Sequence, residues 1–230
     1  MLQVKRTEHK FIIDQKECLR LKSIFGQIMP KDKYCVSKDG YEIRTLYFDT
    51  VGDRCCAEKE DGLRFHEKIR IRIYGISDKV IKLESKKKDG EAQVKRSMKI
   101  DREMCEELIK KNYSVLLKSS EPMAAYFYRK LSDGMLPKVI IQYQRFSYCL
   151  NVNNIRITFD SNIRATESCF DLFKENLLTH PVTPYNIVIL EVKFNGFLLD
   201  YIKKALRNVN TLPSSFSKYF NGRQFYRHMI

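Results

Sequence analysis

Long apolar segments are missing from this chain of 230 residues. No apolar run approaches the roughly 20 residues that a membrane-spanning helix needs, so we expect no transmembrane segment. The first ten residues also lack the apolar stretch of a secretory signal, and from this we expect a cytoplasmic protein. The 7 cysteines are odd in number and show no CxxC spacing, which favours reduced thiols over a disulfide framework.

Several familiar motifs are missing too. The sequence contains no Walker A motif, no GxGxxG and no HExxH, and its histidines have no metal-ligand spacing. The chain also has no composition break that would mark a linker, no low-complexity tract and no internal repeat. We therefore expect a single domain that spans residues 1–230.

Acidic residues are too few to balance the basic ones. The chain has 42 Lys and Arg against 28 Asp and Glu, which gives a net charge of +14. Such an excess favours a polyanionic partner, which could be nucleic acid, an anionic membrane face or a phosphate-rich small molecule. Composition does not choose among these partners. The simplest alternative is that most of the basic side chains only solvate the surface.

Residue periodicity predicts an antiparallel sheet with helices. Alternating apolar and polar residues predict eight strands, at residues 4–13, 42–49, 63–75, 79–88, 92–99, 138–149, 155–164 and 186–195. Helical spacing predicts amphipathic helices at residues 15–28, 101–117, 122–132, 168–178 and 198–209. The remaining segments, including 50–62 and the tail 213–230, are expected to be irregular.

Most of these strands have one apolar face and one charged face. The charged faces hold ten cations: Arg6, Lys10, Lys68, Arg70, Arg72, Lys82, Lys86, Arg145, Arg156 and Lys193. They hold three anions: Glu8, Glu84 and Glu191. A solvated sheet face usually mixes the signs more evenly, because like charges on neighbouring strands repel. The pattern therefore fits either an open sheet or a closed barrel with a cationic lumen that holds a polyphosphate and, through its glutamates, a divalent metal.

Eight short motifs occur in the order in which a known family carries them. They are RTEHKF (6–11), LYFD (46–49), RIRIYG (70–75), LESK with VKR (83–86 and 94–96), YQR (143–145), RITFD (156–160), LEVK (190–193) and SKY (217–219). They resemble the RxExK[YF], YFD, RxRxYG, ExK with VKxR, YxR, RxSxD, LExK and SK[YF] motifs of VTC domains. VTC domains are the polyphosphate polymerase domains of the triphosphate tunnel metalloenzyme (CYTH-like) superfamily.

The resemblance implies a fold and an activity. The fold is α+β, an eight-stranded antiparallel β tunnel with a charged lumen, flanked by amphipathic helices. The activity is metal-dependent transfer of the terminal phosphate of ATP to a growing inorganic polyphosphate chain, with Mn²⁺ or Mg²⁺ as cofactor. ATP or triphosphate and inorganic polyphosphate are then the partners, and we expect no nucleic acid. Most aromatic residues fall on apolar faces, whereas a nucleic-acid surface would interleave them with the basic residues.

The resemblance also implies roles for individual residues. Eight side chains would bind phosphate during catalysis: Lys10, Arg70, Arg72, Lys86, Lys95, Arg145, Arg156 and Lys218. Three more would bind substrate: Tyr143, Lys193 and Ser217. Glu191 would be the principal metal ligand, with Glu8 and Glu84 assisting.

One residue departs from the related triphosphatase branch of the superfamily. That branch begins with ExExK, and Arg6 stands where it has the first glutamate. The exchange removes a metal carboxylate and adds a cation, which favours the polymerase branch. Two alternatives stay open: a triphosphatase that hydrolyses inorganic triphosphate or nucleoside triphosphates, and a non-catalytic module that binds polyphosphate.

Overall fold

The computed structural model describes residues 6–90, 92–207, 209 and 212–227. In this part of the chain the strands are hydrogen-bonded in the order β1-β9-β7-β6-β2-β3-β4-β5, and a short strand β8 pairs with β7. The strands are β1 (Arg6–Asp14), β2 (Tyr41–Thr50), β3 (Phe65–Tyr74), β4 (Ile81–Asp89), β5 (Ala92–Ile100), β6 (Met135–Leu150), β7 (Ile155–Thr166), β8 (His180–Pro181) and β9 (Ile187–Asn195).

The helices lie between these strands and after the last of them. They are α1 (Gln15–Ile28), α2 (Arg54–Glu60), α3 (Arg102–Ile109), α4 (Ala124–Leu131), α5 (Asp200–Leu206) and α6 (Lys218–Arg227), with 3₁₀ turns η1 (Tyr113–Lys118) and η2 (Val152–Asn154). Within the described residues, none of the helices is long and apolar enough to cross a membrane. The α+β class and the eight main strands, antiparallel wherever the register is defined, are confirmed, and closure into a tunnel stays a prediction.

Some expected helices differ from the observed ones. The predicted helix at 168–178 is wrong, because the Asp171 side chain accepts a hydrogen bond from the Phe173 amide at 2.8 Å and forms a turn instead. The predicted helix at 101–117 ends early, because Lys111 has a φ of 70°. The sequence patterns also missed α2 and α6, which lie in segments expected to be irregular.

The chain forms two compact units. Unit 1 comprises Met1–Glu42, Tyr143–Ile163 and Thr183–Ser217, and unit 2 comprises Ile43–Gln142, Arg164–Val182 and Lys218–Ile230. Neither unit is a continuous stretch of chain, since the chain passes from one to the other several times. The expected single domain over residues 1–230 stays a prediction.

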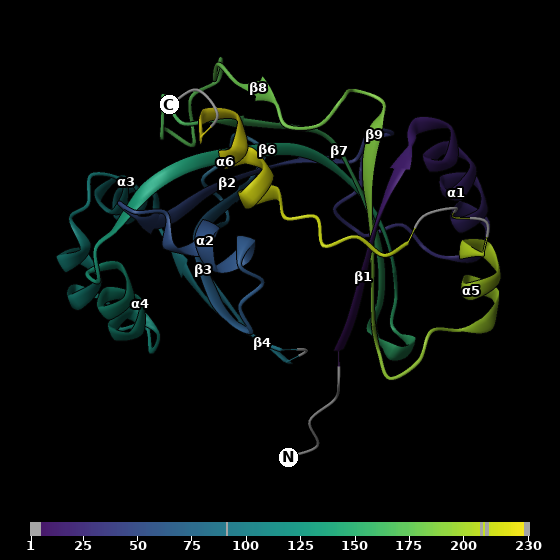
Figure 1. Cartoon of the computed structure of the whole chain (residues 1–230), viewed down its shortest axis with the longest axis horizontal. Helices are drawn as coiled ribbons and strands as arrows, with labels where there is room; N and C mark the ends of the chain where they lie inside the picture. The colour runs from purple at the N-terminus through teal and green to yellow at the C-terminus, as the bar shows by residue number, and fades with distance from the viewer. Residues whose placement is uncertain (1–5, 91, 208, 210–211, 228–230) are drawn as a thin grey trace. The chain divides into compact units, whose positions relative to one another are not determined.

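The core of unit 1 forms between α1 and the apolar faces of β9 and β7. The predicted helix start is confirmed, because the Asp14 side chain accepts a hydrogen bond from the Glu17 amide at 2.7 Å. Leu21 and Phe25 of α1 are fully buried in a cluster with apolar residues of β7, β9 and α5. Helices α1 and α5 lie side by side (Figure 1). This packing leaves the charged face of β1 and β9 on the other side of the strands.

The core of unit 2 lies on the isoleucine-rich face of β3 and β4. Ile69, Ile71 and Leu83 of these strands are fully buried. Helix α4 packs on the same face, because Lys130 pairs with Glu67 of β3 at 2.9 Å. Glu67 also accepts hydrogen bonds from Tyr126 of α4 and from Ser85 of β4. The helix thereby occupies the face opposite to the one that carries the arginines and lysines.

Replacing either of two leucines of α1 with alanine tests the packing of the unit 1 core. Leu21 is 0% exposed and Leu19 is 60% exposed. Leu21→Ala should lower the free energy of unfolding by about 2–5 kcal/mol, because it leaves a cavity. Leu19→Ala should change the free energy of unfolding by less than about 0.5 kcal/mol. Urea unfolding followed by circular dichroism measures both, and equal losses would contradict this packing.

Candidate functional site

The charged face of unit 1 is built from aligned rows on three strands. Glu8 of β1 lies opposite Lys193 of β9, which lies opposite Arg156 of β7. In the next row along the strands, Lys10 lies opposite Glu191, which lies opposite Thr158. Directly opposite residues of antiparallel strands point to the same side of the sheet, as do residues two apart on one strand. The charged residues of the three strands therefore share one face.

Two buried carboxylates, one buried arginine and one half-buried lysine lie at the centre of this face. The Arg145 guanidinium donates two hydrogen bonds of 2.6 Å to Asp160, and its Nη2 lies 3.7 Å from Glu191. The Lys193 Nζ lies 2.6 Å from Glu191. Burial lowers the pKa of Lys193, and the positive charge of Arg145 acts in the same direction, although Glu191 opposes it. Buried Arg145 stays charged, because Asp160 and Glu191 raise its pKa.

Lys10 connects the edge strand to the segment before α6. Its Nζ donates a hydrogen bond of 3.0 Å to the carbonyl oxygen of Phe216 and lies 3.5 Å from Glu8. The Ser214 amide donates to the Lys10 carbonyl oxygen at 2.7 Å. The segment thus covers the free edge of β1 and holds Ser217, which is half-buried, within unit 1.

Two further predicted residues of unit 1 have partners of their own. The Arg145 guanidinium carbon lies 5.3 Å from the centre of the Tyr143 ring. The Arg156 Nη2 donates hydrogen bonds to Asp32 at 2.6 Å and to the Tyr41 hydroxyl at 3.0 Å. The sequence patterns missed Asp32, because it lies in the loop before β2 and has no periodic neighbours. Arg156 Nε and Thr158 Oγ1 are buried and have no hydrogen-bond partner among the described residues.

The charged face of unit 2 is more strongly basic. Its strands β3, β4 and β5 align in three rows: Arg72 with Lys82 and Lys99, Arg70 with Glu84 and Ser97, and Lys68 with Lys86 and Lys95. These three rows therefore hold seven cations and one carboxylate. Two of the rows place like charges directly opposite each other, which is unfavourable unless an anion is bound. Lys99, at a period of two from Lys95, is a basic residue that the motifs did not select.

Glu84 is the fully buried centre of this face. It pairs with Arg70 at 2.8 Å, with Lys95 at 2.5 Å and with Arg72 at 3.9 Å. Burial alone would raise the pKa of Glu84, but the three cations outweigh it and lower the pKa to about 2. Glu84 is therefore ionised at neutral pH and holds the two arginines and Lys95. Its role as an assisting metal ligand stays a prediction.

Strand β2 adds two hydroxyl groups that the motif analysis did not assign. Tyr47 lies opposite Arg70, and its hydroxyl accepts a hydrogen bond of 3.3 Å from the Arg70 guanidinium. Thr45 lies opposite Arg72 and accepts a bond of 3.3 Å from it. Burial would raise the pKa of Tyr47, but Arg70 and Arg72 outweigh it and lower the pKa. Tyr47 belongs to the LYFD motif, and Thr45 precedes it by two residues. Because side chains two apart on a strand share a face, this spacing could have placed both hydroxyl groups on the charged face.

The predicted site residues thus fall into two sets. Unit 1 holds Glu8, Lys10, Tyr143, Arg145, Arg156, Glu191, Lys193 and Ser217. Unit 2 holds Arg70, Arg72, Glu84, Lys86, Lys95 and Lys218, the first residue of α6. Arg6 stands where the triphosphatase branch has its first glutamate, and its side chain lies outside the described side chains.

A divalent metal fits the residues of unit 1 better than those of unit 2. The described residues contain no group of three or more His, Cys, Asp or Glu side chains that could hold a metal ion by themselves. Mg²⁺, however, is commonly held by one or two carboxylates together with substrate phosphates. Glu8 and Glu191 lie on one face in neighbouring rows and meet this requirement. The single carboxylate of the unit 2 face is already enclosed by cations.

The described strands thus carry one strongly basic face in unit 2 and one face of paired cations and carboxylates in unit 1. The VTC domain family model matches residues 5–227, so the chain belongs to the VTC domain family. No curated protein matches the chain.

Two solved structures share the fold. A Bacillus halodurans protein assigned as an adenylate cyclase has 12% identity and a TM-score of 0.52, over 93% of this chain and 96% of that one. A Hippeastrum protein, described as a candidate adenylyl cyclase with a dominant triphosphatase activity, has 12% identity and a TM-score of 0.56, over 95% of each chain. At this identity the likeness concerns the fold alone.

Glu84→Gln tests the balance of charge on the unit 2 face. The ordinary pKa of a glutamate, 4.5, falls to about 2 in the folded protein, so the stabilisation is complete above about pH 4.5. It is lost as the pH falls from about 4.5 towards 2, and the shift corresponds to about 3 kcal/mol. Glu84→Gln should lower stability at pH 7 and flatten this part of the pH profile.

The matched control is Glu103→Gln on the exposed side of α3. Its effect on the free energy of unfolding should stay below about 0.5 kcal/mol. Urea unfolding at a series of pH values measures both variants. A Glu84→Gln protein with the wild-type pH profile would contradict the assigned role.

Proposed function

We propose that this protein is a metal-dependent polyphosphate polymerase, which transfers the terminal phosphate of ATP to a growing inorganic polyphosphate chain. One observation carries the proposal: three neighbouring rows on β3, β4 and β5 hold seven cations around the buried carboxylate of Glu84. The like-charge rows are unfavourable by themselves and become favourable when phosphate oxygens lie between the cations. Membership of the VTC domain family supports the same substrate class.

In this proposal the unit 2 face binds and orients phosphates. The Arg70 and Arg72 guanidinium groups are held by Glu84, Tyr47 and Thr45, so little conformational entropy is lost when they bind an anion. Arginine presents a planar set of donors that matches phosphate oxygens, and lysine adds mobile positive charge. Lys86 and Lys95 lie opposite each other, one row further along the strands, and bind the next phosphate groups.

In unit 1 the proposal assigns metal binding to Glu191 and Glu8. A bound divalent ion would supply charge neutralisation to the phosphate oxygens. Lys10, Arg145 and Lys193 hold the two carboxylates in place and add positive charge for the substrate. The Arg156 Nε and Thr158 Oγ1 atoms are buried donors without a partner among the described residues, and they supply hydrogen bonds to phosphate. Tyr143, Ser217 and Lys218 stay predicted phosphate ligands.

The charge pairing favours a phosphate acceptor over water. Phosphoryl transfer consists mainly of positioning and charge stabilisation. Attack by water also profits from a base, and Glu8, Glu84 and Glu191 are each paired with a cation. A polyphosphate end is already anionic and needs no deprotonation. The triphosphatase activity of the Hippeastrum protein keeps hydrolysis as the second candidate. A cytoplasmic location and the absence of a nucleic-acid partner stay predictions.

Incubation of the protein with ATP and Mn²⁺ tests the reaction directly. We expect acid-labile polyphosphate, which is sized on a polyacrylamide gel and is removed by an exopolyphosphatase. Release of free phosphate alone would favour the triphosphatase. Absence of turnover with retained polyphosphate binding would favour a binding module. Omission of the metal should abolish product, and Mg²⁺ in place of Mn²⁺ identifies the preferred ion.

Glu191→Gln tests the metal assignment. The variant keeps the size of the side chain but removes the charge that would hold the ion. Turnover of ATP should fall by at least about 100-fold, while the dissociation constant for tripolyphosphate measured without metal should change less than about threefold. Glu103→Gln, far along the chain on α3, is the control for the substitution itself. Unchanged turnover in Glu191→Gln would show that the metal ligand is elsewhere.

A further inference from the structure

Within the described side chains of α6, residues 218–224, the helix packs on unit 2 through a tyrosine, a glycine and an arginine. Tyr219, Gly222 and Arg223 are buried and recur at the spacing of one helix face. A Cβ atom added at Gly222 would lie 2.3 Å from the Ile141 Cδ1 atom of β6, so the helix backbone approaches this strand closely. Most helices that pack on a sheet rely on an apolar stripe. Among the described side chains of α6, residues 218–224, the buried ones are a tyrosine, a glycine and an arginine.

Tyr219 ends on a buried carboxylate. Its hydroxyl donates a hydrogen bond to Asp49 Oδ2, and Asp49 is 0% exposed. Asp49 also accepts bonds from the Cys55 amide at 3.0 and 3.1 Å, near the start of α2. Burial and the negative charge of Asp49 both raise the pKa of Tyr219, which therefore keeps its proton. The phenol joins α6 to both β2 and α2.

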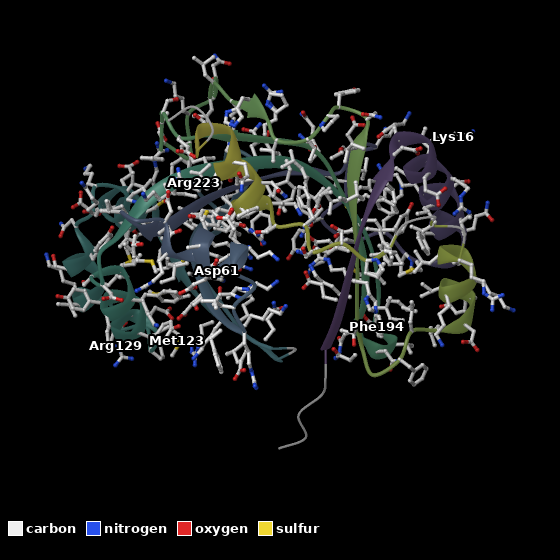
Figure 2. All side chains as sticks on the ribbon, in the orientation of Figure 1. Lys16, Asp61, Met123, Arg129, Phe194 and Arg223 are labelled. Carbon is white, nitrogen blue, oxygen red and sulfur yellow. The ribbon has the colours of Figure 1, made fainter. Side chains whose placement is uncertain are left out.

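Arg223 forms the second attachment, one helical turn further on (Figure 2). Its Nη2 lies 2.5 Å from Asp53, and its Nη1 pairs with Glu167. Lys138 of β6 also pairs with Asp53 at 3.1 Å. A buried arginine between two carboxylates holds a helix in a defined position, because its planar donors bind in one geometry.

The Tyr219 ring contacts the side chains that build the basic face. The ring centres of Tyr219 and Tyr47 lie 5.1 Å apart. The Lys68 Nζ lies 5.7 Å from the centre of the Tyr219 ring. Tyr47 in turn accepts the hydrogen bond from Arg70. Tyr219 therefore contacts a lysine of the face directly and an arginine through Tyr47, and it is adjacent in the chain to Lys218.

We propose that Tyr219 is a positioning residue, through which the docking of α6 is coupled to the binding of an oligophosphate on the unit 2 face. The Asp49 hydrogen bond fixes the Tyr219 ring, the ring fixes Tyr47 and Lys68, and these set the arrangement of Arg70 and the lysine row. By linkage, an anion that prefers this arrangement stabilises docked α6 to the same extent. The inference rests on the proposed function, since it names a residue that acts through the proposed phosphate ligands.

Tyr219→Phe removes the hydroxyl and keeps the ring, so the variant retains the packing on Tyr47. We expect its dissociation constant for tripolyphosphate, measured by titration calorimetry, to rise about tenfold. Tyr185→Phe is the matched control, because Tyr185 is 89% exposed and should leave the affinity unchanged. Arg223→Lys should weaken binding in the same direction, since it keeps the charge but loses the planar contact with two carboxylates.

Amide hydrogen exchange separates positioning from a loss of stability. In the wild type, tripolyphosphate should slow exchange in α6, and in Tyr219→Phe the same saturating concentration should slow it much less. If the wild type binds tripolyphosphate and Tyr219→Phe binds it equally well, the coupling is refuted while the proposed function stands. If exchange in wild-type α6 is the same with and without bound tripolyphosphate, the coupling is refuted too. If the wild type binds no tripolyphosphate, both the coupling and the proposed function fall.

Discussion

Repulsion between like charges on neighbouring strands is the constraint on which the rest of unit 2 depends. Lys68, Lys86 and Lys95 occupy one row, and Arg72, Lys82 and Lys99 occupy another. A sheet tolerates such rows only if something neutralises them, and within the described residues of these strands Glu84 is the carboxylate of this face. Its enclosure by three cations lets the strands pair, and it leaves an excess of positive charge that a phosphate chain can neutralise.

The opposite face of the same strands explains why the charges can be concentrated. Ile69, Ile71 and Leu83 bury their side chains on the helical side, so hydrophobic packing holds the strands in register. The register then decides which cations become neighbours. Hydrophobic packing and concentrated positive charge thus lie on opposite faces of the same strands. Helix α4 packs on the apolar face, whereas Tyr219 of α6 contacts Tyr47 and Lys68 on the charged face.

Unit 1 uses a different balance of charge. Its face carries Glu8, Asp160 and Glu191 with Lys10, Arg145 and Lys193, and the pairs are close enough to compensate one another. A nearly neutral face with several carboxylates suits a divalent cation, and a strongly basic face suits the phosphates themselves. In the proposed function, unit 1 would therefore hold the metal and unit 2 the phosphates.

The sequence by itself determined the strands, their charged faces and the family. Period-two alternation is a local property of the chain, so RIRIYG and LEVK identify strands and their outward residues without knowledge of their partners. Tertiary structure alone decided the rest. Asp32 binds Arg156, which lies 124 positions away in the chain, and Tyr47 binds Arg70, which lies 23 positions away. Alternation along one strand does not reveal which distant residues come into contact. Helix α6 escaped prediction for the same reason, because its Tyr219 and Arg223 bind Asp49 and Asp53, which lie 170 positions away in the chain.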